Sequence, residues 1–488
     1  MASIADVRDV VRGGFASLGG YGGRVLARIA FLLTAGHFFG AVELGYLAQV
    51  AASVEILSAV GVMGLKRTLL GLLSGAAKEG RNVAQVVVEA VLAVAMLSLA
   101  LTGIFVMAWP VLFPTGPEWQ PILLLAIPSI VIADVALAAT RYRRIMRWEV
   151  ITRCVVEPWA FLALAGMLAV LGAKSGGLLI AYAGASFFAM AHALIGLGSV
   201  FGWRTLFIRR PRWKSVVSIP LISLPAGLTD IGVTLFRRID VLLLGLVADP
   251  ATLGVYYMVQ QIATVPYKIH GLFDPMMAPV IAQLHHDRKP RVIEAKLAGV
   301  CRWIFTLQIG LTVPLVIFGD HALALFGSQF ASGAVVLAII LLAELLDGSF
   351  ILTEIPLIYA KPSAALTLIV AALVIEILAI GLMAPVWGAP GAAAGFLLAM
   401  ASLMTGRLAM VRKQLSINVL DRFYWRPVLI ATIIAAPLAV LRYTVTLQND
   451  YLSGLLFAGA LGCFLLMARM LATTRQDRVL LRRLRSRG

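Results

Sequence analysis

The chain has 488 residues, of which 61% are hydrophobic and 13% are charged. A soluble domain carries about 25% charged residues, so this composition excludes a soluble protein and indicates an integral membrane protein. The net charge of +17 raises the question of a nucleic-acid partner, but Lys and Arg gather between apolar segments, as in the cytoplasmic loops of membrane proteins. We therefore expect no nucleic-acid partner.

The sequence offers little support for enzyme chemistry. Cys154, Cys301 and Cys463 are far apart and match neither a metal-ligand spacing nor a disulfide framework. The chain contains no P-loop, so we expect no ATP hydrolysis here. We expect no catalytic residue, no bound metal and no cofactor, with coupling to H⁺ or Na⁺ left open.

Fourteen segments meet the length of roughly 20 mostly apolar residues that a membrane helix needs. They cover residues 20–40, 45–73, 84–113, 119–140, 151–172, 177–202, 215–247, 251–284, 296–326, 331–359, 363–385, 389–411, 425–446 and 451–471. Alternate connections, such as those at residues 141–147 and 204–214, hold nearly all of the Lys and Arg residues. By the positive-inside rule both termini are cytoplasmic.

Short matches indicate an internal repeat. Leu44-Gly45 and Leu253-Gly254 each open a helix after an outer turn, and Arg28 and Arg237 lie sixteen residues before them. The stretches 119–134 and 332–347 have equal length and each ends on an aspartate. The first six helices and the next six then form two copies in the same orientation, with a substrate site between them.

This repeat predicts the domain organisation. The expected parts are a cytoplasmic lead-in (1–20), an N-lobe of helices 1–6 (20–204), a basic cytoplasmic linker (205–214), a C-lobe of helices 7–12 (215–413), two extra helices (414–472) and a basic cytoplasmic tail (473–488).

The motif R-R-I-D-V-L-L-L-G, followed by T-L-G-V-Y-Y, together with two six-helix lobes, resembles the polysaccharide transporters of the multidrug/oligosaccharidyl-lipid/polysaccharide (MOP) superfamily, flippases of the Wzx type. The extra helix pair is also similar to that of the peptidoglycan lipid II flippase. The resemblance implies an all-α fold with a V-shaped central cavity, alternating access, a polyprenyl-pyrophosphate-linked oligosaccharide as cargo, and a place in the bacterial cytoplasmic (inner) membrane.

The stretch from Pro220 to Leu284 combines apolar helices with ionisable residues and prolines. Ionisable groups inside a membrane are costly unless they are paired or face water, so we expect this stretch to line a cavity. Pyrophosphate is held well by Arg forks and Lys point charges. The substrate-binding candidates are Arg24, Arg28, Arg237, Arg238, Lys268 and Arg302. Snorkelling to the interface or pairing with acidic side chains remains open for Arg24 and Arg302.

Acidic residues inside the apolar segments are the candidates for coupling or gating. They are Glu55, Asp134, Asp230, Asp240, Glu344, Asp347 and Glu354. One interpretation is a cation-coupling site, and the other is ion pairing with the arginines that holds the protein closed on one side.

Other residues predict local structure. The prolines between Pro266 and Pro279 predict a bend in the helix that contains them. Gly388, Gly391 and Gly395 provide a small-residue face for close helix packing. His192 stands alone in an apolar segment, so we expect it to be hydrogen-bonded rather than a ligand.

The sequence therefore predicts a flippase for lipid-linked oligosaccharide repeat units in the synthesis of surface polysaccharide. Its expected partners are the lipid-linked cargo, membrane lipids and a polysaccharide polymerase or ligase. An ion-coupled exporter of drugs or other lipids is the alternative. A membrane glycosyltransferase, polymerase or ligase is less favoured, because such enzymes need a sizeable outer loop and this chain has only short ones.

Overall fold

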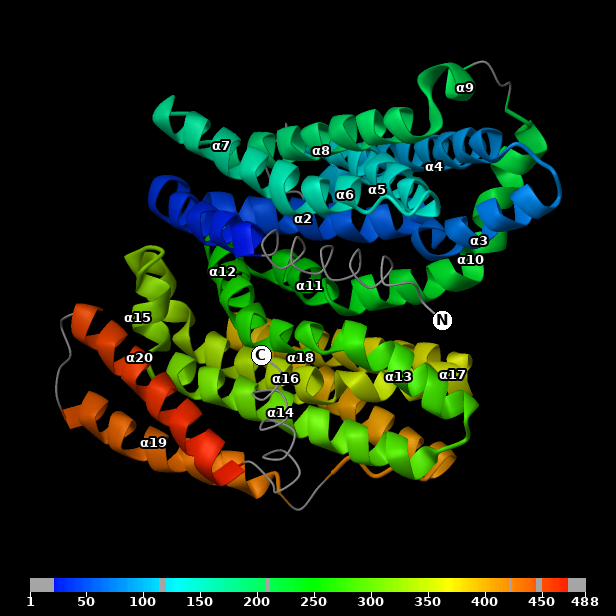
Figure 1. Cartoon of the computed structure of the whole chain (residues 1–488). Helices are drawn as coiled ribbons and strands as arrows, with labels where there is room; N and C mark the ends of the chain where they lie inside the picture. The colour runs from blue at the N-terminus through cyan, green and yellow to red at the C-terminus, as the bar shows by residue number, and fades with distance from the viewer. Residues whose placement is uncertain are drawn as a thin grey trace. The chain divides into compact units, whose positions relative to one another are not determined.

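A computed structural model describes residues 22–113, 117, 120–207, 211–420, 423–444 and 450–472. The predicted lead-in and basic tail lie outside these residues, as do positions 208–210 of the predicted linker. Every regular element within the described ranges is helical (Figure 1). This agrees with the all-α class expected from the sequence.

Ten helices among the described residues are long and apolar enough to cross a membrane. Large apolar side chains cover their outer surfaces; Met107, Val111 and Val170, for example, are 83%, 83% and 88% exposed. Water does not tolerate so much exposed apolar surface, but lipid does, and helices satisfy their own backbone hydrogen bonds in lipid. The chain is an all-helical, polytopic membrane protein.

Two long stretches each contain two of the predicted segments. The first runs from Gly22 to Lys78, and its chain direction changes at Gly40, where φ is +80°. The second is α18 (Pro362–Leu415), which is broken at Gly388 with φ 59° and ψ −135°. Both breaks use a left-handed backbone that favours glycine. These two stretches account for two of the four segments by which the ten long helices fall short of the fourteen predicted ones. The other two are the broken run from Pro250 to His286 and the shorter apolar helix Gly454–Met470.

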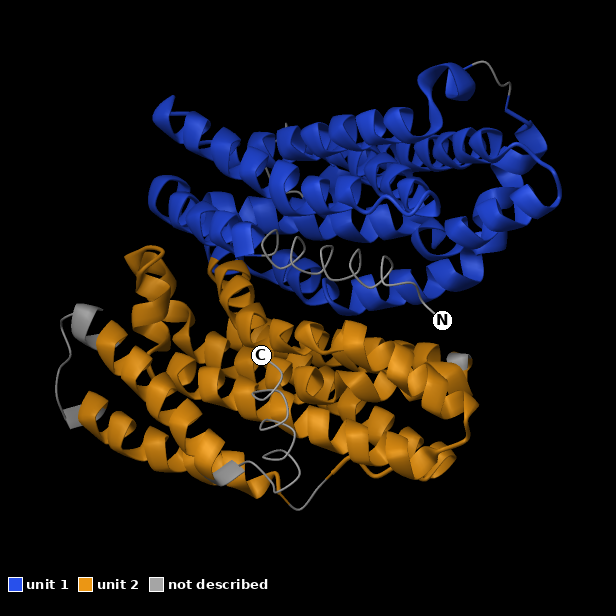
Figure 2. Cartoon of the chain, in the orientation of Figure 1, with its two compact units in different colours: residues 1–254 blue, residues 255–488 orange. Residues whose placement is uncertain are grey.

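The chain forms two compact units, residues 1–254 and 255–488 (Figure 2). Unit 1 begins with a helical segment over residues 22–34. Its further elements are η1 (Ala35–Phe39), α2 (Gly40–Val62), α3 (Leu65–Lys78), α4 (Val83–Leu112), η2 (Gln120–Leu125), α5 (Ala126–Tyr142), α6 (Arg147–Ile151), η3 (Thr152–Val156), α7 (Glu157–Val170), α8 (Gly177–Phe201), α9 (Trp203–Phe207), α10 (Trp213–Phe236) and α11 (Ile239–Val247).

Helix α5 lies at the centre of unit 1. It packs against α2, α3, α4 and α8 (Figure 1). The faces of α5 that contact these helices carry small buried residues, among them Ala133, Ala136, Ala138 and Ala139. Small residues let membrane helices approach closely and gain packing contacts. The one acidic residue of α5, Asp134, is thereby placed inside the unit.

Unit 2 contains most of α12 (Pro250–Tyr267), which starts just before the boundary. It continues with η4 (Lys268–Leu272), α13 (Asp274–His286), α14 (Pro290–Ile317), α15 (Gly319–Ala324), η5 (Ser328–Gly333), α16 (Ala334–Phe350), η6 (Ile351–Thr353), α17 (Glu354–Ala360), α18, α19 (Trp425–Thr444), α20 (Asp450–Met467) and η7 (Ala468–Ala472).

The two arms of α18 form a close helical hairpin within unit 2. A Cβ atom added at Gly391 would lie 2.2 Å from the carbonyl oxygen of Met383, and one at Gly395 would lie 2.6 Å from Ile380 Cγ1. Only glycine allows helices this close. The structure confirms the predicted close packing at Gly391 and Gly395. It does not do so at Gly388, which forms the break and where an added Cβ atom would meet nothing within 4 Å.

Helices α19 and α20 pack on α14. The ring of Phe464 on α20 leaves no room for a side chain at Gly310, where a Cβ atom would lie 2.3 Å from Phe464 Cδ1. Arg442 of α19 also donates to Asp320 of α15 at 2.6 Å. The two C-terminal helices are thus docked by both apolar and ionic contacts within unit 2.

The compact units divide after Gly254, whereas the lobes predicted from the repeat divide at residues 205–214. Helix α10 packs against α2, α3 and α4, and α11 packs against α2, so both belong to unit 1 by their contacts. The lobe boundary drawn from the repeat remains a prediction.

Similar runs of elements occur in both units. Helix α2 has 23 residues and is followed, after a break, by α3 with 14 residues; α12 and η4 together match α2 in length, and α13 has 13 residues. The six-residue helices η2 and η5 each precede an α-helix of 17 residues. In this register Asp134 is the ninth residue of α5 and Asp347 the fourteenth of α16. The predicted match of these two aspartates is therefore wrong, because the two stretches counted in the sequence start at different points of the elements.

Candidate functional site

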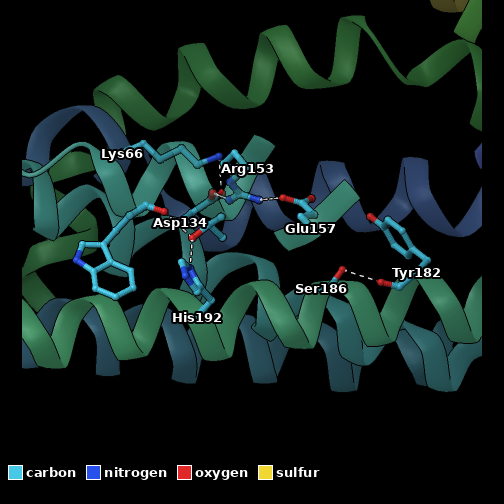
Figure 3. Close-up of polar contacts among 9 residues, drawn as sticks. Lys66, Asp134, Arg153, Glu157, Tyr182, Ser186 and His192 are labelled. Atoms are coloured by element: carbon cyan, nitrogen blue, oxygen red, sulfur yellow. Dashed lines mark hydrogen bonds and ion pairs between the residues drawn. The ribbon is translucent and has the colours of Figure 1, made fainter. Parts of the chain in front are cut away.

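The Asp134 cluster of unit 1 consists of Lys66, Asp134, Arg153 and Glu157 (Figure 3). Asp134 is 6% exposed, and its carboxylate pairs with Lys66 of α3 and Arg153 of η3. Arg153 Nη1 also donates to Glu157 Oε2 at 2.7 Å. A lone charge at this depth would cost about 2.5–3.5 kcal/mol or more, and the two cations offset this cost for Asp134.

Arg153 reaches Asp134 from a π-helical turn, residues Thr152–Val156. Such turns insert one extra residue into a helix and are frequent at functional sites. Thr152 Oγ1 donates to the Trp148 carbonyl at 2.7 Å and lies 2.8 Å from His192 Nδ1. Because the hydroxyl has one hydrogen, His192 Nδ1 is then the donor in the second contact. The structure confirms the hydrogen bond expected of His192.

Two ion pairs join α2 and α3 to the α10–α11 segment. Arg238, at the start of α11, donates from Nε and Nη2 to the two oxygens of Glu55 on α2 at 2.5 and 3.2 Å. Arg67 of α3 pairs with Asp230 of α10 at 2.7 Å. All four side chains are partly exposed. They are therefore ion pairs that another charged group can reach.

At the two ends of α2, glycines let the helix backbone approach a neighbouring backbone directly. At its start, a Cβ atom on Gly45 would lie 1.8 Å from the Pro250 carbonyl oxygen of α12, and one on Gly254 would lie 1.8 Å from the Ala41 carbonyl oxygen. The contact is reciprocal: each glycine faces the carbonyl of the residue four positions before the other. We call this contact the Gly45–Gly254 pair.

Beyond the other end of α2, Gly64 faces Gly227 of α10. A Cβ atom on Gly64 would lie 2.3 Å from the Gly227 nitrogen, and Gly64 itself has φ +77°. One turn further along α3, Thr68 Oγ1 donates to Ser223 Oγ at 2.7 Å. Helix α2 is thus flanked at both ends by contacts that only glycine permits.

The Asp347 cluster of unit 2 consists of Asp347, Glu354 and Arg407. Arg407 Nη1 donates to Asp347 Oδ1 at 2.5 Å, and its Nη2 lies 2.9 Å from Glu354 Oε2. The Asp347 side chain is 1% exposed and that of Arg407 is 8% exposed. One guanidinium group therefore joins two carboxylates inside unit 2.

The predicted break near Pro266 is present between α12 and α13, where η4 holds Lys268 and His270. The amide nitrogen of Gln308 on α14 lies 3.2 Å from the Pro266 carbonyl oxygen and 3.3 Å from that of Tyr267. His270 Nδ1 also lies 2.6 Å from the Tyr267 oxygen. Carbonyls released by a helix break in a membrane need such partners. Gln308, not one of the predicted residues, supplies them.

The structure brings together some predicted site residues and separates others. Arg24 and Lys268 are exposed, Arg28 and Arg237 are half-buried, and Asp240, Glu344 and Arg302 are buried. Arg302 is 5% exposed and lies over the Phe423 ring at 5.8 Å, so it does not snorkel to the surface. The roles predicted for these residues remain predictions.

Sequence reasoning missed several partners of the acidic residues. Lys66 and Arg67 resemble the basic residues of a cytoplasmic connection, but they lie in α3 and form ion pairs. Arg153 carried a usable signal, since Glu157 follows it by four residues on the same helix face. Arg407 carried another, because it stands alone in an apolar segment where an arginine indicates a buried partner.

The sequence matches a protein-family model described as "Polysaccharide biosynthesis protein" over residues 43–336, which is more than half of the chain. The chain belongs to this family. Among curated proteins no sequence matches.

Solved structures show the fold of this family member to be that of MOP-superfamily transporters. A structure titled lipid II flippase MurJ, inward closed conformation, aligns with a TM-score of 0.73 at 13% identity, covering 93% of this chain and 98% of that one. An inward-facing multidrug resistance MATE family transporter of the MOP superfamily aligns with a TM-score of 0.62 at 14% identity, covering 79% and 94%. A mutant form of the Vibrio cholerae MATE transporter VcmN gives 0.53 at 14% identity, covering 84% and 100%. The family resemblance read from the sequence is confirmed.

The region matched by the polysaccharide biosynthesis family contains the Asp134 cluster and the ion pairs of Glu55 and Asp230. The Asp347 cluster begins eleven residues beyond it.

Proposed function

We propose that this polysaccharide biosynthesis protein is a flippase that moves polyprenyl-pyrophosphate-linked oligosaccharide repeat units across the cytoplasmic membrane by alternating access. Membership in the family supports a role in making surface polysaccharide (O-antigen, exopolysaccharide or capsule). The similarity to a lipid II flippase supports a fold suited to moving lipid-linked cargo.

The observation that carries the proposal is the set of contacts along α2. Its two ends meet neighbouring helices through the glycine contacts at Gly45 and Gly64. Between and beside these ends lie the exchangeable ion pairs of Glu55 and Arg67. In alternating access a helix pair must close on one side and release on the other. Glycine contacts release without leaving a cavity, and an anionic cargo competes with the carboxylates for the arginines.

The fourteen-helix count and the parallel repeat belong to this proposal. The ten long helices include two stretches that each hold two segments. The broken run from Pro250 to His286 and the shorter apolar helix Gly454–Met470 bring the total to fourteen. The matched elements of the two units support two six-helix copies, with α19 and α20 added.

In this proposal the cationic residues bind pyrophosphate and the acidic ones couple or gate. Arg28, Arg237 and Arg238 are the main cargo ligands, with Arg24, Lys268 and Arg302 assisting. Asp134 holds Lys66 and Arg153, and Asp347 and Glu354 hold Arg407; these carboxylates, with Asp240 and Glu344, are the candidates for exchange of H⁺ or Na⁺. Glu55 and Asp230 release their arginines when cargo arrives. The sites lie in a protein of the inner membrane with both termini in the cytoplasm.

A reconstituted flipping assay tests the proposal. The purified chain is placed in liposomes with a fluorescent polyprenyl-pyrophosphate-linked oligosaccharide, and the label on the outer leaflet is quenched with dithionite. We expect faster loss of protected label than in protein-free liposomes, and slower flipping with Arg238→Gln. The matched control is Arg412→Gln, since Arg412 is an exposed arginine at the end of α18.

Two results would contradict the proposal. One is a flipping rate no higher than in empty liposomes, measured for protein that size-exclusion chromatography shows to be folded. The other is export of a cationic dye by protein that leaves the oligosaccharide lipid in place, which would favour the exporter alternative.

A further inference from the structure

A polar cavity of about 440 Å³ opens at one end of unit 1, apart from the charge clusters described above. It is lined by Gly80, Arg81, Asn82, Gln85, Val86 and Arg212. These residues come from the α3–α4 loop, the first turn of α4 and the residue before α10, which lie at the same end of the unit (Figure 1).

The two sides of this cavity are fixed by a buried carboxylate. Glu89 of α4 is 0% exposed, and its Oε1 accepts from the Arg212 backbone N–H at 2.9 Å and from Gln85 Nε2 at 3.0 Å. Asn82 caps α4 by accepting from the Ala84 and Gln85 backbone nitrogens. The backbone that carries Arg212 is therefore tied to α4 and is not a free loop end.

The guanidinium groups of Arg81 and Arg212 make no hydrogen bond to the described residues. The Arg81 guanidinium lies 3.8 Å from Glu79 Oε2 and 4.0 Å from Glu89 Oε2, both beyond hydrogen-bond distance. Among the described residues the structure gives the Arg212 guanidinium no hydrogen bond and no ion pair. Two guanidinium groups beside one polar cavity suit a phosphate, whose oxygens accept paired N–H donors.

Exposed aromatic and basic residues surround this end of unit 1. Trp203, Phe207 and Trp213 are 46%, 79% and 63% exposed, and the Trp203 and Phe207 rings stack at 5.8 Å. Exposed Trp side chains beside basic residues are typical of the membrane–water interface, where anionic lipids attract Lys and Arg. A phosphate that reaches this cavity is thus most readily supplied by the bilayer.

We propose that this cavity binds the phosphate of an anionic phospholipid headgroup, held by Arg81 and Arg212. The lipid anchors the α3–α4 loop and the start of α10 at the membrane surface. The site does not depend on the transported cargo, and it stands or falls separately from the flippase proposal.

Binding of short-chain lipid to the purified full chain in detergent tests the site. Dioctanoyl phosphatidylglycerol is titrated against the wild type and against Arg81→Gln/Arg212→Gln, with native mass spectrometry as the readout. We expect the double variant to bind at least about tenfold more weakly, because it loses two groups that make charge-assisted hydrogen bonds. Arg212→Lys, which keeps the charge but not the fork, should fall between them and shows whether the fold tolerates change at this position.

Two controls test whether the loss of binding is specific to the cavity and whether the bound phosphate comes from a lipid. Arg204→Gln removes an exposed arginine of α9 that does not line the cavity, and we expect it to bind like the wild type. An equal loss in this control would overturn the proposal, because general surface charge would then explain binding. Inorganic phosphate that competes at concentrations equal to the lipid would also overturn it and point to a soluble phosphate ligand.

Discussion

A single methyl group at the Gly45–Gly254 pair should prevent α2 and α12 from meeting. In Gly45→Ala the new Cβ atom would lie 1.8 Å from the Pro250 carbonyl oxygen, and in Gly254→Ala an equal distance from that of Ala41. Ordinary contact begins near 3.4 Å. The helices must therefore separate by about 1.5 Å at this end.

The cost follows from overpacking. Forcing one extra carbon into a close contact costs about 1–3 kcal/mol. Alanine is a better helix former than glycine by up to about 1 kcal/mol, but it keeps this advantage whether the contact is closed or open. The ratio of closed to open contact should then fall about 5- to 150-fold.

Cysteine labelling measures this shift. Leu44→Cys places a thiol beside the pair at a position that is 0% exposed, in a background where the exposed Cys463 is replaced by serine. Maleimide should modify this thiol slowly in the parent and faster by the factor above with Gly254→Ala. The control is Gly103→Ala on α4, where an added Cβ atom meets nothing within 4 Å.

Equal labelling rates for the parent and Gly254→Ala, in protein that remains monodisperse, would refute the reasoning. The helices would then adjust to the methyl group without opening, and the pair would not be a contact that transport makes and breaks.

Three further predictions follow from the ion pairs. Arg238→Gln and Glu55→Gln should each slow flipping, because each leaves a partner charge unpaired, and the double variant should be no slower than the worse single one. Arg407→Gln should lower the free energy of unfolding by about 3–5 kcal/mol, because it leaves two carboxylates without their cation in a buried cluster, and chemical unfolding in detergent measures this loss. Arg442→Gln should lower Tm at neutral pH, because it removes a cation that stabilises the Asp320 carboxylate. Burial alone would raise the pKa of Asp320, but its hydrogen bonds with His321 and the nearby Arg442 guanidinium hold that pKa below the usual 3.8. The stabilisation is therefore present above pH 3.8 and lost as pH falls through the lower folded-state pKa, so the Tm difference should shrink there.

Each of these has its own contrary result. Additive slowing in the double variant would show that Arg238 and Glu55 do not act as a pair. A loss of stability in Arg412→Gln as large as that in Arg407→Gln would contradict the second prediction. Arg412 is exposed, so burial of the arginine could not then explain the loss. A Tm difference for Arg442→Gln that stays constant with pH would show that Asp320 is not its partner.

Much of the helical framework could be predicted from the sequence, because apolar length and glycine or proline breaks are local signals. The predicted range 177–202 agrees with α8, and the break near Pro266 and the close packing at Gly391 are visible in the residue types alone. The predicted segments 363–385 and 389–411 likewise correspond to the two arms of α18, which is broken at Gly388.

The ion-pair partners were much harder to predict. Glu55 and Arg238 are 183 residues apart, and Asp347 and Arg407 are 60 apart. No local pattern links such residues, since their meeting depends on how helices pack. The acidic members stand out because carboxylates in apolar segments are rare, whereas Lys66 and Arg67 lie near a helix end, where basic residues usually mark a loop.

The flippase proposal is tested most directly by deleting the gene and following lipid-linked oligosaccharide on both membrane leaflets together with surface polysaccharide. We expect complete repeat units to accumulate on the cytoplasmic leaflet and surface polysaccharide to be lost, with rescue by the wild-type chain but not by Arg238→Gln. Repeat units that still reach the outer leaflet in the deletion strain would contradict the proposal.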